Sequence, residues 1–204
     1  YEDLEIPAAT DLGVIKLTAL NMTLDEIKIT ADYGIDRRLP ATFSNVSTQY
    51  IEEYAGTQEV PELLKFTPGV YTTKEGGGVG DSRIYIRGFA QENITVMING
   101  VPVNDMENGR VYWSNWNGLG DVTSSMQVVR GLGASKLAIG SIGGTINIIT
   151  NSVDSKKGGS YMQQVSDYGQ FKETLSYNTG RMNGDWAISA LVSKTDGNGY
   201  VDGT

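Results

Sequence analysis

Two glycine-punctuated blocks of alternating apolar and polar residues lie between Ser82 and Thr150, and they constrain the fold more than any other feature. The first block reads RIYIRGF and then ITVMINGVPV, and the second reads MQVVRGLGASKLAIGSIGGTINIIT. Alternation over about four to eight residues is typical of a strand with one buried face. Asn99-Gly100 is a strong hairpin signal because both residues tolerate positive φ. The blocks therefore predict short strands joined by tight turns.

Short helices are expected between these strands, so the predicted class is α+β with a small mixed sheet. Ser47 can cap one helix that ends at Gly56, and Thr57 can open a second with Pro61 in its first turn. The stretch from Asn104 to Gly120 is long and polar and is expected to be an exposed loop. A further short helix is expected at Gly133–Leu137, and the expected strands are Arg83–Arg87, Ile94–Ile98, Val101–Val103, Met126–Arg130 and Thr145–Thr150.

The pattern changes from Gly158 onward, where Ser160–Ser166, Phe171–Thr179 and Asp185–Thr195 have the length and spacing of membrane β-barrel strands. In the last of these, Trp186, Ile188, Ala190 and Val192 alternate with small or polar residues. Three strands cannot close a barrel, and hydrocarbon does not tolerate an open sheet edge. We therefore expect the chain to stop inside a second domain.

Before residue 42 the sequence suggests a strand at Gly13–Thr18, an extended stretch at Leu24–Ala31 and a polar linker up to Pro40. The chain opens on Tyr1 rather than Met, which favours a fragment of a longer protein. The expected division is residues 1–22 as the end of an N-terminal extension, 23–41 as an extended segment and linker, 42–152 as the main domain, and 158–204 as barrel strands.

Composition excludes several classes of function. The net charge is −8, from 24 acidic and 16 basic residues, and no stretch concentrates Lys and Arg, so nucleic acid is not an expected partner. The chain contains no Cys and no His, which removes thiolate and imidazole chemistry and the commonest zinc ligands. The adjacent Glu52 and Glu53 diverge on a helix and do not form a catalytic pair. We expect no enzyme, no cofactor and no metal centre.

Motifs that suggest phosphate or calcium binding have simpler explanations. Gly131-x-Gly133 precedes an expected helix, but Lys136 stands where the third glycine of a dinucleotide fingerprint belongs. The loop EGGGVGDS, Glu75–Ser82, lacks the lysine of a phosphate loop. Neither of two acidic clusters keeps the spacing of a calcium loop, so solvated turns are favoured. These clusters are Asn104, Asp105, Glu107 and Asn108, and Asp196, Asn198 and Asp202.

Arg83 and Arg87 occupy alternate positions of one expected strand, on the face opposite Ile84 and Ile86. A solvated sheet face is the simpler explanation for two such arginines. A second arginine-glycine pair, Arg130-Gly131, ends another expected strand and favours a polar face that docks against a water-filled barrel wall.

Taken in order, PELLKFTPGV (Pro61–Val70), IYIRGF, ITVMINGVPV and VVRGLGASKLAIGSIGGTINIIT resemble the plug domain of TonB-dependent outer-membrane receptors. Residues 158–204 resemble the first strands of that family's barrel of about 22 strands, and Gly13–Ala31 resembles the end of a carboxypeptidase-regulatory-like extension found in Bacteroidetes. The residues that match the plug motif are Arg83, Arg87, Gly88, Asn99, Gly100, Arg130, Gly131, Gly143 and Gly144.

The resemblance implies a receptor in the outer membrane of a Gram-negative bacterium, surrounded by lipid, that imports a scarce nutrient on energy transduced by TonB. The best match to the TonB-binding segment is DEIKITA, an extended stretch suited to strand addition at a partner's sheet edge. An ordinary strand of the N-terminal domain is the alternative. The segment consists of Asp25, Glu26, Ile27, Lys28, Ile29, Thr30 and Ala31.

By the same resemblance, the ligand should meet the plug loops Lys74–Ser82 and Asn104–Asn117. Tyr112, Trp113 and Trp116 in the second loop suit stacking on a chelate, a corrin or a sugar, although packing against barrel loops is an equal alternative. The sequence after Arg130 lacks the lysine–aspartate pair of SusC-type glycan importers, which favours a ferric siderophore or another metal chelate. A glycan or peptide importer and a ligand-sensing signalling receptor are the alternatives.

Overall fold

A computed structural model describes residues 42–76, 80–131, 141–150, 155–166, 169–182 and 186–198. The elements expected before residue 42, including the TonB-binding segment, and the helix expected at Gly133–Leu137 lie outside these described residues. The described chain forms a five-stranded sheet, a two-stranded hairpin and a separate curved three-stranded sheet.

The five-stranded sheet has the order β1-β6-β7-β4-β5. β4 and β7 pair in parallel, whereas the other neighbouring pairs are antiparallel, so the sheet is mixed and the α+β prediction is confirmed. Its strands are β1 (Thr42–Val46), β6 (Thr123–Arg130), β7 (Gly144–Thr150), β4 (Ile94–Ile98) and β5 (Val101–Pro102). The sequence patterns did not predict β1.

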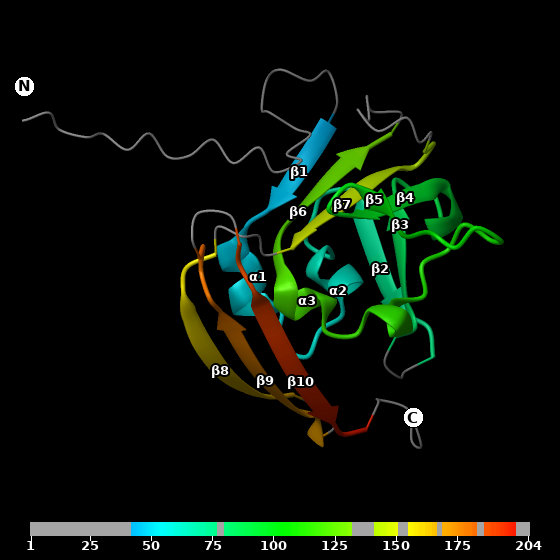
Figure 1. Ribbon diagram of the computed structural model, residues 1–204. Helices are drawn as coiled ribbons and strands as arrows, with labels where there is room; N and C mark the ends of the chain where they lie inside the picture. Colours follow the sequence, from blue (N-terminus) through cyan, green and yellow to red (C-terminus); the bar gives the residue numbers. More distant parts are fainter. Residues whose placement is uncertain are drawn as a thin grey trace, which may run out of the picture.

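A hairpin of β2 (Val70–Lys74) and β3 (Ser82–Ile86) stands beside this sheet, with the helix α2 (Val60–Leu63) near the hairpin and the helix α1 (Thr48–Tyr54) beside β6 (Figure 1). α1 contacts β6, and α2 contacts both strands of the hairpin. The alternating burial of β3 agrees with its sequence pattern, but β2 was not predicted.

The start of the first helix was predicted correctly and that of the second was not. Ser47 caps α1 by accepting a hydrogen bond from the Tyr50 backbone N–H. The second helix begins after Glu59 rather than Thr57, because Glu59 and Glu62 form a reciprocal capping box one turn apart. Pro61 lies in the first turn as expected.

The apolar residues of the two β layers and of the helices share one core. Such a core excludes water from the central strands and holds the sheet, the hairpin and the helices together. Its fully buried members include Leu63, Leu64, Ile84, Ile86, Ile94, Val96, Met126, Val128, Ile146 and Ile148.

The hairpin between β4 and β5 has the predicted turn. Asn99 has φ 51° and Gly100 has φ 82°, as a turn with two left-handed residues requires. The Asn99 side chain also donates to Thr150 Oγ1 (2.9 Å) and accepts from the Thr150 backbone N–H (3.0 Å). The turn is therefore fixed to the end of β7 as well as closed on itself.

The stretch from Asn104 to Gly120 is only in part the exposed loop that its polarity suggested. It contains the 3₁₀ turn η2 (Trp113–Trp116) and leads into α3 (Leu119–Val122), and Val111 and Trp113 are buried. A shorter 3₁₀ turn, η1 (Gln91–Asn93), precedes β4. Local polarity failed as a guide here because the apolar minority of the segment packs into the core.

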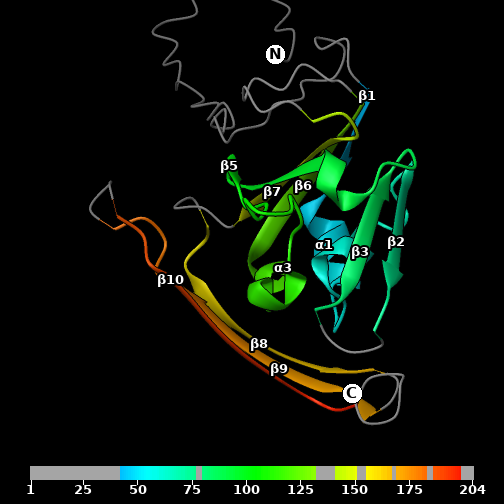
Figure 2. The ribbon, with the colours of Figure 1, turned by 90° about the vertical axis from the view of Figure 1, so that its right-hand side faces the viewer.

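The curved sheet consists of β8 (Gly158–Val165), β9 (Phe171–Asn178) and β10 (Ser189–Asp196), all antiparallel, and Figure 2 shows it bent around one side of the main body. Its outer face exposes large apolar side chains, among them Leu175 and Val192. Within the described part of the chain, no helix combines the length and hydropathy needed to cross a membrane.

Candidate functional site

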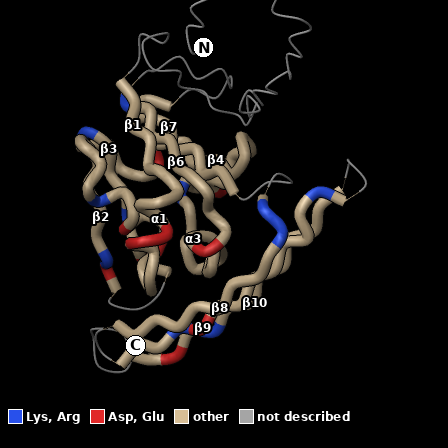
Figure 3. Tube along the Cα trace, turned by 90° about the vertical axis from the view of Figure 1, so that its left-hand side faces the viewer, with Lys and Arg blue, Asp and Glu red and all other residues tan. Residues whose placement is uncertain are grey.

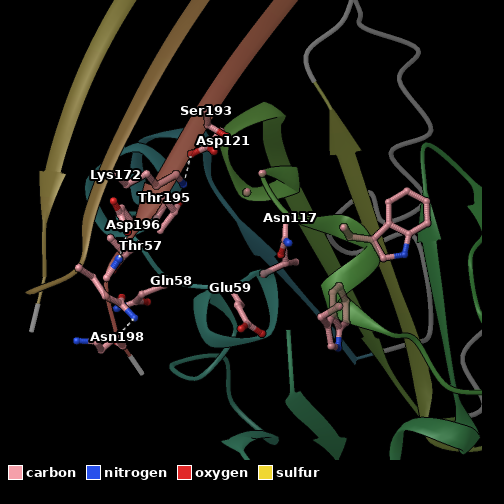
Figure 4. A pocket seen from close by; sticks show the side chains of 18 residues that line it. Thr57, Gln58, Glu59, Asn117, Asp121, Lys172, Ser193, Thr195, Asp196 and Asn198 are labelled. Atoms are coloured by element: carbon pink, nitrogen blue, oxygen red, sulfur yellow. Dashed lines mark hydrogen bonds and ion pairs between the residues drawn. The ribbon is translucent and has the colours of Figure 1, made fainter. Parts of the chain in front are cut away.

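A cleft of about 530 Å³ lies between the main body and the curved sheet. Its lining comes from the segments around α2, η2 and α3 on one side and from β9 and β10 on the other (Figure 4). We call it the wall cleft. Its charged lining residues are Glu59, Asp121, Lys172 and Asp196.

Lys172 of β9 fixes the curved sheet to the main body at this cleft. Its Nζ lies 2.7 Å from Asp121 Oδ1 and donates to the Gly56 carbonyl oxygen at 3.2 Å. The two side chains are only 10% and 8% exposed, so the ion pair is nearly shielded from water. The ammonium is therefore held by two groups on the main body.

Two carboxylate oxygens in the wall cleft are buried without a hydrogen-bond partner among the described residues, Asp121 Oδ2 and Glu59 Oε2. The other oxygen of Glu59 accepts a hydrogen bond from the Gly80 backbone N–H, at the tip of the β2–β3 hairpin. A Cβ on Gly80 would lie 2.5 Å from Ser114 Cα, so the hairpin tip touches the η2 segment. The two loops predicted to meet the ligand are thus adjacent, and the second of them, Asn104–Asn117, contributes to the lining of the cleft.

The three predicted ligand-binding aromatic residues occupy different environments. Trp113 is 3% exposed, and its indole N–H donates to the buried Gln91 side chain at 3.3 Å. Trp116 is partly buried and packs on the core, and both tryptophans line the wall cleft. Tyr112 is exposed, and its hydroxyl accepts from Asn108 Nδ2 at 2.7 Å. Trp113 supports the fold, whereas Tyr112 offers an open ring.

The motif arginines do not share one strand face as expected. Arg83 pairs with Glu75 at 3.0 Å, but Arg87 lies beyond the end of β3 with φ 51°, followed by Gly88 at φ 83°. The chain turns there because Phe89 folds back to bridge Ile86. The alternation that sequence reasoning extended to Arg87 therefore ends one residue earlier.

Arg130 points into the main body rather than toward a barrel wall. It is 9% exposed and donates to the carbonyl oxygens of Pro68 and Phe43, the second at 3.2 Å. Burial, and then the nearby Arg87 charge, lower the pKa of its guanidinium below the ordinary arginine value. Arg130 thereby satisfies carbonyls on two segments distant in sequence.

Two of the motif glycines, Gly143 and Gly144, stand where a side chain would not fit. A Cβ on Gly143 would lie 2.7 Å from the Phe89 Cβ, and Gly144 has φ 146° with its backbone against Val129. Gly131 has φ 80°. These positions join the strand ends around β7 closely, which explains their glycines by geometry without any phosphate ligand.

Asn104 belongs to one of the two acidic clusters described above, and its side chain forms hydrogen bonds with backbone groups. Its Oδ1 accepts from the Val96 N–H at 2.8 Å, and its Nδ2 donates to the Ile94 and Gly109 carbonyls at 2.9 Å and 2.7 Å. Among the residues that the structure describes, no group of three acidic or other ligating side chains could hold a metal ion.

Lys172, Asp121 and Glu59 were not predicted from the sequence as site residues. Lys172 and Asp121 lie 51 positions apart, so no local spacing links them. The one available signal was a lysine at an inward position of an expected barrel strand, where polar side chains face a lumen. Figure 3 marks acidic positions on both α1 and α3, beside the curved sheet.

The architecture is thus a mixed sheet with a side hairpin, packed inside the curve of an outwardly apolar antiparallel sheet. Residues 36–145, more than half of the chain, match the family model of the TonB-dependent receptor plug domain. The chain therefore belongs to the TonB-dependent receptor family.

Curated relatives are named as receptors and transporters. The chain is 28% identical over 169 residues to a probable TonB-dependent siderophore receptor, PirA, of Acinetobacter baumannii. This match covers 77% of this chain and 22% of the relative. It is 29% identical over 118 residues to the vitamin B12 transporter BtuB of Vibrio vulnificus. This match covers 58% of this chain and 19% of that relative. The chain thus spans about a fifth of the length of these relatives, which are transport receptors and not enzymes.

Solved structures confirm the fold. FpvA of Pseudomonas aeruginosa, bound to a pyoverdine–iron complex, superimposes with a TM-score of 0.63 at 18% identity, over 82% of this chain and 22% of that chain. The siderophore receptor PirA of Acinetobacter baumannii superimposes with a TM-score of 0.56 at 22% identity, over 75% of this chain and 24% of that chain.

Proposed function

We propose that this chain is the plug and the first barrel strands of an outer-membrane receptor that imports a scarce nutrient, a ferric siderophore or another metal chelate. The family match over residues 36–145 is the observation that carries the proposal. Relatives named as siderophore receptors and vitamin B12 transporters support a chelate as cargo. No residue acts as a catalyst in this scheme.

In this proposal the main body, residues 42–152, blocks the barrel, and residues 158–204 begin the barrel wall. The outward apolar side chains of the curved sheet face the lipid of the outer membrane, as the exposure of Leu175 and Val192 supports. The ligand meets the plug near the hairpin tip and η2, where Tyr112 and Trp116 supply aromatic surface.

The energy for import comes from TonB, which binds the extended segment Asp25–Ala31 by strand addition. This segment alternates Ile27 and Ile29 with polar residues, as an added edge strand requires. Pulling on it transmits force to β1, which begins a short distance along the chain and pairs with β6.

A deletion strain tests the proposal. Deleting the gene should abolish growth on one defined chelate as sole iron or cobalt source, and the gene supplied in trans should restore it. The receptor variant Ile27→Pro, supplied in trans, should still bind the chelate but should not restore growth. Proline removes a backbone N–H that strand addition needs. Asp36→Asn, in the linker, is the matched control and should restore growth. Normal growth of the deletion strain on every iron and cobalamin source would contradict the proposal.

A further inference from the structure

We propose that a polar row on the outer face of the curved sheet binds the lipid headgroups of the outer leaflet and sets the depth of the receptor in the outer membrane. The row consists of Gln163 of β8, Glu173 of β9 and Lys194 of β10, and we call it the headgroup row. The inference rests on the proposed function, because it takes the curved sheet to be barrel wall, and it adds where the hydrocarbon ends on that wall.

Burial distinguishes the two faces of the curved sheet. On β9, Lys172 and Thr174 are buried, and Lys172 binds the main body, so this face of the strand is turned toward the plug. Leu175 and Tyr177 are exposed on the opposite face. Because successive side chains of a strand alternate between faces, Glu173 belongs to the same outer face as Leu175.

The strand register places the headgroup row side by side across three strands. Glu173 lies opposite Gln163 on β8 and opposite Lys194 on β10. Its Oε1 accepts hydrogen bonds from Gln163 Nε2 at 3.1 Å and from the Tyr161 hydroxyl at 2.8 Å. Polar side chains, two of them charged, therefore lie together on a face that elsewhere exposes apolar groups.

The polarity of the outer face changes at the headgroup row. On one side of the row the sheet ends within two residues, at Val165, Phe171 and Asp196. On the other side, the described outward positions between Lys194 and Trp186 carry no charge. The large exposed side chains on that side are Leu175, Tyr177, Trp186, Ile188 and Val192.

Charged side chains on a lipid-facing surface indicate their depth. A lysine on the outside of a barrel is strongly unfavourable at the bilayer midplane, and it costs little at the interface, where its long chain reaches the headgroups. Glu173 and Lys194 would lack partners among acyl chains, whereas the phosphate and ammonium groups of lipid headgroups complement both charges. The row therefore fits the headgroup layer.

The opposite end of the curved sheet has the features of a second boundary. Lys156 and Lys157 precede β8 and Arg181 follows β9, all exposed, and Figure 3 shows basic positions at this end. Trp186 is exposed at the same end, and tryptophan favours the membrane interface. Lys194 lies eight positions after Trp186, which at about 3.3 Å per residue and a tilt of about 40° spans about 20 Å, close to the roughly 25 Å apolar band of such barrels.

The headgroup row lies at the ligand side of the receptor. Lys172 and Thr195, which adjoin Glu173 and Lys194 in sequence, line the wall cleft together with Trp116 of η2. In the proposed function the ligand meets the plug at η2, so this end of the sheet faces the outside of the cell. The wall cleft then opens at the level of the outer headgroups rather than within the hydrocarbon.

Spin labels on single cysteines test the depth directly. The chain contains no Cys, so Gln163→Cys, Lys194→Cys, Leu175→Cys and Tyr177→Cys each give one site once any cysteine elsewhere in the full-length receptor is replaced by serine. In phosphatidylethanolamine–phosphatidylglycerol vesicles, labels at 175 and 177 should collide more with oxygen. Labels at 163 and 194 should collide more with a water-soluble nickel chelate.

A matched pair of lysine insertions gives an independent measurement. Ala190 and Gln163 are both exposed on the outer face, and Ala190 lies midway between Trp186 and Lys194. In urea titrations of the full-length receptor in the same vesicles, Ala190→Lys should lower the ratio of folded to unfolded receptor about thirtyfold, and Gln163→Lys less than about fivefold. Equal losses would overturn the proposed depth.

The outcomes separate this inference from the import function. Labels at all four positions with the same preference, in a receptor that still takes up a chelate, would overturn the depth and leave import standing. Labels that all prefer the nickel chelate, together with normal growth of the deletion strain on every iron and cobalamin source, would overturn both.

Discussion

Gly144 joins the start of β7 to the neighbouring strands at a distance that only glycine allows. Its φ of 146° is unfavourable for other residues, and an added Cβ would press on the Val129 carbonyl oxygen. We expect Gly144→Ala to lower the free energy of unfolding by about 3 kcal/mol. Gly88→Ala is the control, because Gly88 also has positive φ (83°) but nothing within 4 Å, so about 1 kcal/mol is expected. Urea denaturation of the refolded chain measures both, and equal losses would contradict the steric explanation.

Glu92 should make the stability of the plug sensitive to acid. A hydrogen bond to its own backbone, and after it the Arg110 side chain at 2.6 Å, hold the pKa of Glu92 below the ordinary value of 4.5 despite partial burial. A lowered folded-state pKa stabilises the protein above the unfolded-state pKa, and this stabilisation is lost as the pH falls through the folded value. Between about pH 6 and about pH 3, the native chain should therefore lose more stability than Glu92→Gln.

The same pH series on Arg110→Met provides the control for Glu92. Removing the guanidinium removes one cause of the shift, so the acid sensitivity should lie between those of the native chain and Glu92→Gln. Acid sensitivity equal in all three proteins would contradict the role of this carboxylate.

At the level of secondary-structure elements, the Lys172–Asp121 pair ties β9 to α3. Lys172→Met leaves the Asp121 carboxylate buried without a partner, which should cost about 3–5 kcal/mol. Lys74→Met breaks a more exposed pair with Glu62 and should cost less than about 1 kcal/mol. Hydrogen exchange of the β9 amides measures the difference. Adding Asp121→Asn to Lys172→Met should recover part of the loss, and a loss that persists in full would contradict the ion-pair explanation.

Elements fixed by local chemistry were predictable, and elements fixed by distant partners were not. The Asn99-Gly100 turn, the Ser47 cap and the alternating β3 and β10 are readable because their determinants lie within a few residues. β1 and β2 gave no local signal, since their partners are β6 and β3 and their own sequences, TFSNV and VYTTK, alternate weakly.

Some features of the candidate site could likewise be predicted from the sequence, and others could not. Aromatic residues in the 104–117 loop were recognised, but whether Trp113 supports the fold or binds a ligand depends on Gln91 and on core packing that no spacing reveals. Arg130 was identified as a motif position, yet its hydrogen bonds to the Pro68 and Phe43 carbonyl oxygens follow only from the folded chain. The wall cleft itself needs β9 and β10 in place.

At the scale of the whole molecule, the plug and the curved sheet form one assembly, in which the sheet supplies Lys172 and the plug supplies its partners. This ion pair, together with the hydrogen bond from Lys172 to the Gly56 carbonyl oxygen, joins the two parts at the wall cleft.

The most direct test of this account is uptake of a radiolabelled chelate that the receptor binds, by cells that express the full gene, before and after a protonophore collapses the proton gradient. We predict that binding to the cell surface persists while accumulation inside the cell stops. Accumulation that continues at the same rate without the gradient would indicate a passive pore and would contradict the account.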